Sequence, residues 1–333
     1  MRLDIILPTH NRASLLRRAL DSLLAAEVPL GLDVHVAVID NNSIDDTRDL
    51  VHSRLSEFGG RLSYLFEPRP GKPYALNTGI AGTSGDLIGL IDDDEEIDRG
   101  WYRCIGEAFG DGTLDYIGGR CLPRWGGARP RWLGGRYRAV IGWVDGGPEP
   151  RDFGPSYPGI LTGGNAVLRR AVMNRVGPYS AALSRTPTRL MGAEDAHFYR
   201  RLLLLGARGR YRPDLVIYHY VPAERLTKRY FRRWAFWCGV SRGVMDWEYP
   251  AQGAYIAGVP RYLIGKALRN ALRSARRMLT RPDRPDDRFA SELNFWDLAG
   301  FIYGKHFYRP PQTARLDARA TVDGEVRCQG GRA

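Results

Sequence analysis

The chain has 333 residues, of which 44% are hydrophobic and 11% aromatic, and its formal net charge is +12. These values exclude a disordered chain and are typical of a globular protein with one large core or two smaller ones. No window approaches ~18 consecutive apolar residues, and the N-terminus has no signal-peptide layout, so we expect a cytoplasmic protein. The strong positive charge favours a polyanionic partner: nucleic acid, anionic lipid or a phosphorylated substrate.

Strand and helix patterns alternate in the first hundred residues. Short apolar runs predict strands at residues 3–7, 34–39, 62–67 and 87–91. Between them, apolar residues recur every three or four positions, or acidic residues open a segment, as in helices. The alternation predicts an α/β fold with a mostly parallel, doubly wound, Rossmann-like sheet, in which ligands bind at the carboxyl ends of the strands.

Five consecutive acidic residues, Asp92 to Glu96, follow the fourth predicted strand. They repel one another, so such a run is tolerable mainly where a cation or a basic partner compensates it. Hard oxygen ligands at this position suit Mg²⁺ or Mn²⁺ carrying a diphosphate. A solvated acidic turn is the simpler alternative.

Residues 118–164 lack periodicity and are rich in Gly, Pro, Arg and Trp. So long an irregular segment indicates a binding loop or lid, which we expect to recognise an acceptor. Further along, residues 260–279 form a basic amphipathic helix, which can lie in an anionic lipid interface or dock on the domain with its arginines solvated. An aromatic-rich segment follows at 289–307, and residues from 310 onward have the composition of a disordered tail.

Six short motifs stand at predicted strand ends or helix starts: Pro8–Arg12, Asp40–Ser43, Gly71–Asn77, Ile91–Asp94, Gly163–Asn165 and Glu194–Asp195. Their order resembles that of family 2 glycosyltransferases of the GT-A fold, and the resemblance covers about residues 1–234. It implies transfer of a sugar from a nucleotide-diphosphate donor, most often a uridine diphosphate sugar, with Mg²⁺ or Mn²⁺ as cofactor.

The resemblance also assigns roles to individual residues. It implies nucleotide-sugar binding by Pro8, Thr9, Arg12, Asp40, Asn42, Lys72, Asn77, Asp92 and Asp93. It implies a metal site made of Asp92, Asp94 and His219, although His219 could equally be a packed core histidine. Asp195, next to Glu194, matches the catalytic base, and acceptor-side positions are Gly164, Asn165, Arg233 and Trp234.

We therefore expect a GT-A domain at residues 1–235, with a nucleotide-binding half (1–117) and an acceptor and catalytic half (118–235). A helical membrane-surface extension (236–309) and a tail (310–333) follow. The expected reaction is inverting transfer of a single sugar to a hydroxyl of a glycan or lipid-linked acceptor in cell-envelope polysaccharide biosynthesis, at the inner face of the plasma membrane. Tyr230 replaces the Gln of the Gln-x-x-Arg-Trp motif of processive relatives, which favours single additions.

Two other interpretations remain open at this stage. The first is a catalytically degenerate protein that uses the same fold to bind anionic surfaces, which the net charge of +12 supports. We do not expect nucleic acid as a partner, because basic residues do not alternate with a stacking platform. The second is a sugar nucleotidyltransferase, against which stands the absence of a glycine-rich phosphate loop after the first strand.

Overall fold

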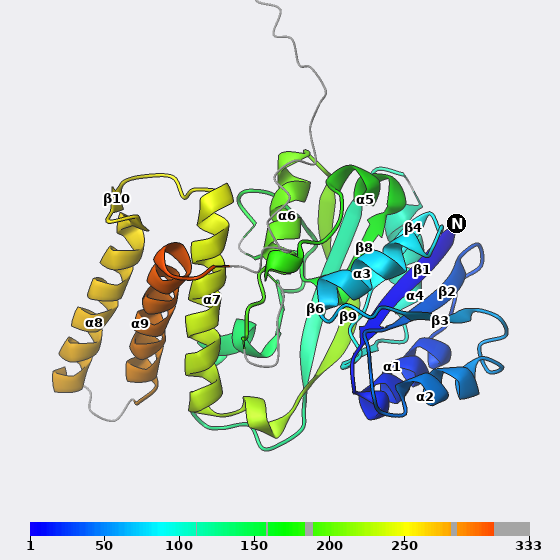
Figure 1. The fold of residues 1–333 in the computed structure, drawn as a ribbon, viewed down its shortest axis with the longest axis horizontal. Coiled ribbons are helices and arrows are strands. Elements are labelled where there is room, and N and C mark those ends of the chain that lie inside the picture. The colour runs from blue at the N-terminus through cyan, green and yellow to red at the C-terminus, as the bar shows by residue number, and fades with distance from the viewer. Residues whose placement is uncertain (111, 158, 184–188, 281–284, 310–333) are drawn as a thin grey trace, which may run out of the picture.

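The computed structural model describes residues 1–110, 112–157, 159–183, 189–280 and 285–309. The predicted tail, residues 310–333, lies outside the described residues. A large sheet covered by helices forms one part of the molecule, and three long helices stand side by side at its other end (Figure 1).

The central sheet has nine strands. Eight of them follow in the order β3 (Leu62–Phe66), β2 (Asp33–Asp40), β1 (Arg2–Thr9), β4 (Leu87–Leu90), β8 (Ala166–Arg169), β6 (Tyr116–Trp125), β9 (Gly209–Val221) and β5 (Glu95–Ile97), and β7 (Arg151–Asp152) pairs with β9. The first four run parallel, whereas β8 is antiparallel to both β4 and β6. The predicted α/β class, with a largely parallel central sheet and C-terminal helices, is confirmed.

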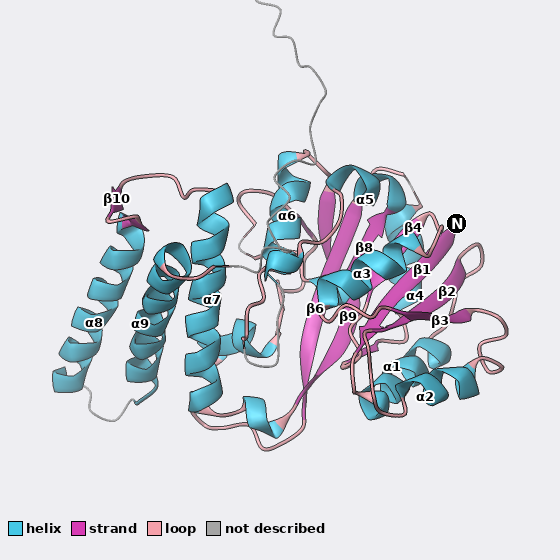
Figure 2. Ribbon diagram, viewed as in Figure 1, coloured by secondary structure: helices cyan, strands magenta, loops and turns pink. Residues whose placement is uncertain are grey.

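Helices cover both faces of this sheet (Figure 2). The helices on one face are α1 (Ala13–Ala25), α2 (Thr47–Arg54) and α4 (Trp101–Phe109), and those on the other are α3 (Lys72–Ala81), α5 (Arg170–Val176) and α6 (Glu194–Leu204). Neighbouring residues of β1 enter different cores, since Ile5 packs with the first set and Ile6 with the second. A strand buried on both faces is therefore a continuous apolar run, which is the pattern seen in the sequence.

The segment predicted to be irregular, residues 118–164, begins instead within a central strand. β6 runs through Gly118 and Gly119 and pairs with β8 and β9. A Cβ at Gly119 would overlap the backbone carbonyl of Leu215, where the β6 and β9 pairing shifts register. The glycines therefore permit close strand contact, although in the sequence they look like loop residues. After β6, the chain forms the 3₁₀ helix η1 (Gly135–Ile141) and then β7.

The C-terminal part is built from α7 (Lys228–Glu248), α8 (Arg261–Thr280) and α9 (Pro285–His306). A short hairpin of β10 (Tyr255–Ile256) and β11 (Val259–Pro260) connects α7 to α8. The predicted domain boundary after residue 235 falls inside α7. Among the described residues, no helix combines the length and the apolar character needed to cross a bilayer.

Helices α7 and α9 cross at glycine residues, where their backbones are in contact. A Cβ at Gly300 or Gly304 of α9 would overlap backbone atoms of Phe236 or Val240 on α7. Gly239 and Gly243 of α7 meet the α9 backbone in the same way. Four glycines, spaced four apart on each helix, thus let the two backbones touch, and larger side chains would force the helices apart.

Candidate active site

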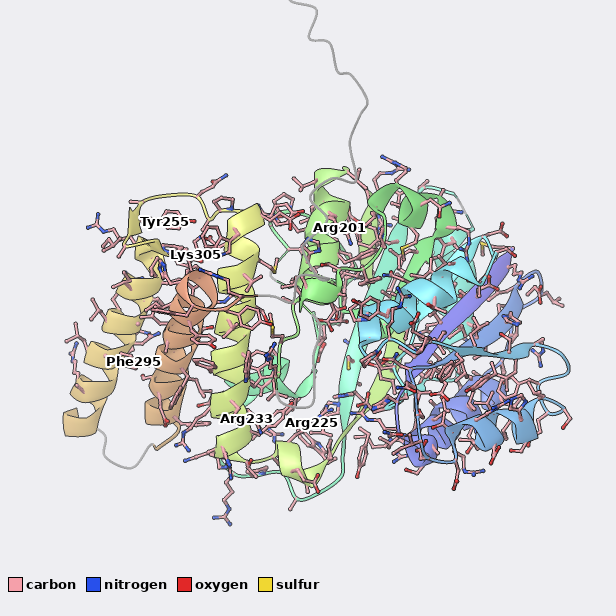
Figure 3. The ribbon with its side chains drawn as sticks, viewed as in Figure 1. Arg201, Arg225, Arg233, Tyr255, Phe295 and Lys305 are labelled. Atoms are coloured by element: carbon pink, nitrogen blue, oxygen red, sulfur yellow. The ribbon has the colours of Figure 1, made fainter. Side chains whose placement is uncertain are left out.

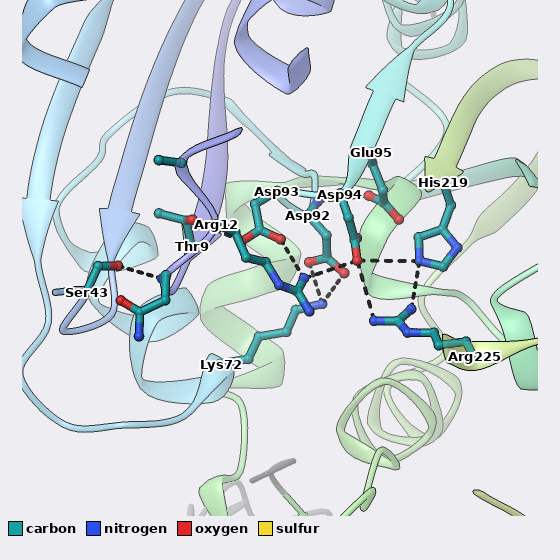
Figure 4. Close-up of polar contacts among 12 residues, drawn as sticks. Thr9, Arg12, Ser43, Lys72, Asp92, Asp93, Asp94, Glu95, His219 and Arg225 are labelled. Carbon is teal, nitrogen blue, oxygen red and sulfur yellow. Dashed lines mark hydrogen bonds and ion pairs between the residues drawn. The ribbon is translucent and has the colours of Figure 1, made fainter. Parts of the chain in front are cut away.

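The five acidic residues run from the loop after β4 into β5 and meet basic side chains from several other segments (Figure 4). Arg12, at the start of α1, donates through Nη1 to Asp93 Oδ1 at 2.9 Å and to Asp94 Oδ2 at 3.1 Å. The hydroxyl of Thr9, at the end of β1, donates to Asp93 Oδ2 at 2.9 Å. The first loop of the sheet therefore binds the acidic run directly, as the motif order implies.

Lys72, the first residue of α3, brings a second cation to this run. Its Nζ lies 2.5 Å from Asp92 Oδ1 and 2.7 Å from Asp92 Oδ2. Burial alone would lower the pKa of Lys72, but the charges of Asp92, Asp195 and Glu194 outweigh it and raise the pKa. Lys72 therefore stays charged and couples the acidic run electrostatically to the start of α6.

The loop that carries Lys72 is held by buried polar groups. Asn41 donates to the carbonyl oxygens of Glu67 and Arg69 at 3.1 and 2.6 Å, and its Oδ1 accepts from the Gly71 N–H at 2.7 Å. The Glu67 carboxylate is bound by both Arg69 and Thr78. Hydrogen bonds from Arg69 lower the pKa of Glu67 to about 2 against the opposing effect of burial. These contacts fix the turn before α3.

On the opposite side, Asp94 meets residues that follow in the chain from β9 onward. His219 Nε2 lies 3.6 Å from Asp94 Oδ2, and Arg225 Nη2 lies 3.7 Å from the same oxygen. Burial alone would raise the pKa of Asp94, but His219, Arg12 and Arg225 outweigh it and lower the pKa below its usual range. Asp94 is therefore a fully ionised carboxylate surrounded by donors.

Two adjacent glycines join Asp195 to the acidic run. A Cβ at Gly164 would overlap the Glu95 carboxylate, and a Cβ at Gly163 would overlap the Asp195 carboxylate. The Gly163 N–H also donates to Asp195 Oδ2 at 2.9 Å. Because consecutive residues touch the two carboxylates, the structure brings Asp195 of α6 close to Glu95 although a hundred residues separate them in the chain.

Three carboxylates at the site have a raised pKa, in contrast to Asp94. Burial raises the pKa of Asp195, against the opposing effects of Lys72 and the Gly163 N–H. Burial likewise raises the pKa of Asp93 to about 6 and, together with Asp92 and Asp94, that of Glu95 well above its ordinary value. Asp195 Oδ1 is shielded from solvent and has no hydrogen-bond partner among the described residues. Asp195 thus combines a raised pKa with a buried acceptor atom that has no partner in the described part of the chain.

A family model described as "Glycosyl transferase family 2" matches residues 4–177, which is more than half of the chain. The chain belongs to glycosyl transferase family 2. The match contains β1 to β4, the acidic run and Gly163 to Asn165.

Several individual proteins resemble this family 2 chain. The succinoglycan biosynthesis protein ExoM of Rhizobium meliloti (strain 1021) is 26% identical over 242 residues, covering 70% of this chain and 72% of that protein. A glucosyl-dolichyl phosphate glucuronosyltransferase of Haloferax volcanii is 23% identical and covers 75% of this chain and 79% of its own length. The fold resembles that of mannosyltransferase PcManGT from Pyrobaculum calidifontis, solved with GDP-Man and Mn²⁺ (TM-score 0.59, 20% identity, 91% of this chain and 86% of that one). The GT-A fold is therefore confirmed.

The divalent metal expected for this glycosyltransferase would need carboxylate or imidazole ligands at the acidic run. Within the described residues, no three His, Cys, Asp or Glu side chains are grouped closely enough to hold an ion. Of the three predicted ligands, Asp92 is paired with Lys72, and Asp94 lies beside Arg12, Arg225 and His219. His219 Nδ1 donates to the carbonyl oxygen of Ile141 at 3.0 Å, and Nε2 lies on the side of Asp94, 3.6 Å from its Oδ2. A metal site made of Asp92, Asp94 and His219 therefore stays a prediction.

Four further predicted donor-side residues lie around the first two strands and α3. Pro8 is buried at the end of β1, opposite Ile39 of β2. Asp40 is buried and accepts from the Tyr64 hydroxyl at 2.7 Å and the Ser43 N–H at 2.8 Å. Asn42 is exposed at a backbone φ of +64°. The Asn77 amide bonds both backbone groups of Tyr179, so it anchors α3 to that segment and its role in donor binding stays a prediction.

The Asn165 side chain, predicted on the acceptor side, lies inside the protein, and its role toward an acceptor stays a prediction. This side chain is fully buried and donates to the carbonyl oxygens of Arg120 and Leu215 at 2.8 and 2.9 Å. Its Oδ1 accepts from Trp101 Nε1 at 2.9 Å. Because its donors and its acceptor are engaged inside the protein, Asn165 holds β6, β9 and α4 together. Gly164 beside it serves as a small residue under Glu95.

The two residues predicted from the processive motif lie on α7. Arg233 is exposed, and no hydrogen bond or ion pair joins it to the acidic run in the described part of the chain. Trp234 packs against an aromatic cluster that contains Phe231. Arg225, in the turn before α7, contacts Asp94 instead (Figure 3 labels both arginines). Sequence reasoning missed Arg225 and Glu67, because neither stands out from its neighbours in the sequence, and it gave no role to Asn41 within the motif Asp40–Ser43.

Proposed function

We propose that this glycosyltransferase moves a single sugar, with inversion, from a nucleotide-diphosphate sugar to a hydroxyl group of a glycan or lipid-linked acceptor in cell-envelope polysaccharide biosynthesis. The observation that supports this proposal most directly is the place of Asp195. Its Oδ1 has no hydrogen-bond partner among the described residues, and Gly163 and Gly164 connect it to the acidic run. The site therefore combines a base with a place for a diphosphate.

In this mechanism, Asp195 takes the proton from the acceptor hydroxyl while that oxygen bonds to the anomeric carbon. The bond from this carbon to the diphosphate oxygen breaks at the same time, and the electron pair leaves with the diphosphate. Burial raises the pKa of Asp195, which makes its carboxylate a stronger base. Attack opposite to the leaving group inverts the configuration at the anomeric carbon.

The basic side chains around the acidic run can stabilise the leaving diphosphate. Arg12, Lys72 and Arg225 are each partly exposed, so a ligand can draw them away from Asp92, Asp93 and Asp94. We further propose that Mg²⁺ or Mn²⁺ binds to Asp94 and His219, where its charge would offset that of the diphosphate. The arginines and Lys72 would then complete the charge balance.

The proposed donor and acceptor are based on the relatives, and the proposed membrane contact is based on α8. The relative from Haloferax volcanii is named for an acceptor attached to dolichyl phosphate, and PcManGT was solved with GDP-Man. We propose a lipid-linked or glycan acceptor and a nucleotide-diphosphate sugar donor, with uridine as the first base to test. Leu268 and Leu272 of α8 are 58% and 72% exposed beside several basic residues, which supports attachment to the inner face of the membrane.

The base assignment is tested with Asp195→Asn. We expect transfer to fall by roughly 10²–10⁴-fold, since that is the usual contribution of a general base. Binding of the nucleoside diphosphate, measured by calorimetry with Mn²⁺, should change little, because Asp195 does not contact the proposed diphosphate site.

Transfer by Asp195→Asn at the wild-type rate would disprove the base assignment. Nucleotide binding by the wild-type protein without transfer to any of a panel of acceptors would favour a catalytically degenerate protein instead.

A further inference from the structure

A cavity of about 500 Å³ lies between helices α7, α8 and α9 and η1, and none of the residues of the acidic run lines it. Helices α7, α8 and α9 each contribute to its walls. The lining is divided by chemistry: Tyr137, Trp234 and Leu293 give it an apolar part, and Arg242, Lys266 and Arg273 give it a basic part. None of these residues belongs to the acidic run or the start of α6, although Trp234 is also a predicted acceptor-side residue.

The basic part has more positive charge than its surroundings neutralise. Asp297, which also lines the cavity, pairs with Arg242. Arg242 Nε is nevertheless buried and has no hydrogen-bond acceptor among the described residues. Lys266 and Arg273 are exposed, and no carboxylate pairs with either of them in the described part of the chain. An unsatisfied buried donor beside two unpaired cations is a site for an anion.

The apolar part indicates what the anion is attached to. Trp234 is half-buried beside the aromatic cluster of Phe231, and Leu293 continues this surface on α9. On α8, Leu268 and Leu272 are mainly exposed, close in sequence to Lys266 and Arg273. A free inorganic anion would gain no binding energy from these apolar surfaces, whereas the first carbons of a lipid chain would be removed from water there.

We propose that this cavity binds the phosphate group of an anionic membrane lipid, with the phosphate at Arg242, Lys266 and Arg273 and the adjoining lipid chain along Trp234 and Leu293. The site is separate from the carboxylates that would carry out transfer. A specific site of this kind differs from a non-specific attraction between α8 and an anionic surface, because the lipid binds with a defined stoichiometry.

The experiment uses the full chain and two double variants with equal loss of charge. Lys266→Gln/Arg273→Gln removes the two exposed cations of the cavity. Arg261→Gln/Arg269→Gln removes two cations from the same helix that do not line the cavity. Native mass spectrometry then counts bound dilauroyl phosphatidylglycerol, with dilauroyl phosphatidylcholine and inorganic phosphate as the comparison ligands. Circular dichroism confirms that both variants are folded.

We expect one phosphatidylglycerol per chain in the wild type and in Arg261→Gln/Arg269→Gln, and at least tenfold weaker binding in Lys266→Gln/Arg273→Gln. Phosphatidylcholine and inorganic phosphate should both bind at least tenfold more weakly than phosphatidylglycerol. Equal loss in the two double variants would overturn the proposal, because it would indicate attraction by the whole helix. Inorganic phosphate binding as tightly as the lipid would also overturn it, since the apolar part would then have no role.

Discussion

Buried carboxylates have fewer compensating partners at the acidic run than where α7 crosses α9. Asp93, Asp94 and Glu95 are only 5%, 8% and 5% exposed, and they repel one another although Arg12 and Arg225 lie close to Asp94. In the crossing region, Asp246 is equally buried, but Lys305 Nζ, the Tyr255 hydroxyl and the Ala251 N–H all bind it.

This difference distinguishes a region that serves catalysis from one that serves the stability of the fold. The acidic run keeps charge that burial makes costly, and its cations are partly exposed, so a ligand can rearrange them. At the α7–α9 crossing, the carboxylate is satisfied by the protein and the backbones are in contact. We therefore expect substitutions at the acidic run to change catalysis more than stability, and substitutions at the crossing to do the reverse.

The largest effect on stability is expected for Lys305→Met. This change leaves the Asp246 carboxylate buried without its cation, which typically costs about 3–5 kcal/mol. Urea unfolding of the full chain measures the loss. Lys305→Arg keeps the charge and should lose much less. If Lys305→Met unfolded at the same urea concentration as the wild type, the contrast between the two regions would be wrong.

A smaller loss is expected for Gly304→Ala. The new Cβ would overlap the Val240 carbonyl oxygen, so α7 and α9 must separate, at a cost of about 1–3 kcal/mol. Gly265→Ala is the matched control on α8, where the nearest atom to the new Cβ is the flexible Arg269 Nη1 at 3.3 Å. The control should stabilise the helix by up to about 1 kcal/mol. Thermal unfolding that shows the same sign for both variants would contradict the close crossing.

At the acidic run, Asn41→Ala should affect the donor rather than the fold. It removes the three hydrogen bonds that fix the turn before Lys72. We expect the KM for the nucleotide sugar to rise on the order of tenfold, since a loosened lysine binds phosphate less well, while kcat changes less. Steady-state kinetics separate the two constants. A fall in kcat with unchanged KM would show that this turn acts on the chemical step instead.

The smallest effect is expected from a change of pH in the wild-type protein. Because burial raises the pKa of Asp195, the base is protonated, and transfer is lost, at a higher pH than an ordinary aspartate would give. The acid limb of the kcat profile should therefore lie above pH ~4, the usual value for this side chain, and activity should increase as the pH rises through the limb. A limb at or below that value would mean that the site does not raise the pKa of Asp195 during turnover.

Much of the structure of the first hundred residues follows from local sequence patterns. The apolar runs of β1, β2 and β4 and the polar motifs after them are short-range features, because strand burial and strand ends depend on a few consecutive residues. The same holds for the grouping of Thr9 and Arg12 with the acidic run, since parallel strands end at one edge of the sheet.

Other features depend on contacts that no local pattern encodes. The glycines of β6 look like loop residues until β9 packs against them, and Asn165 looks exposed until three elements enclose it. Arg225 is one of many arginines in a strongly basic chain. Its position next to Asp94 results from the path of β9 through the sheet.

The sequence by itself determined the fold class, the family and the run of carboxylates, because these depend on periodicity and on motifs of a few residues. Only the tertiary structure decided that Gly163 and Gly164 join Asp195 to Glu95, that Asp92 pairs with Lys72, and that a basic cavity opens between α7, α8 and α9. The physical reason is that burial, pKa and ion pairing are set by neighbours in space, and chain folding alone makes those residues neighbours.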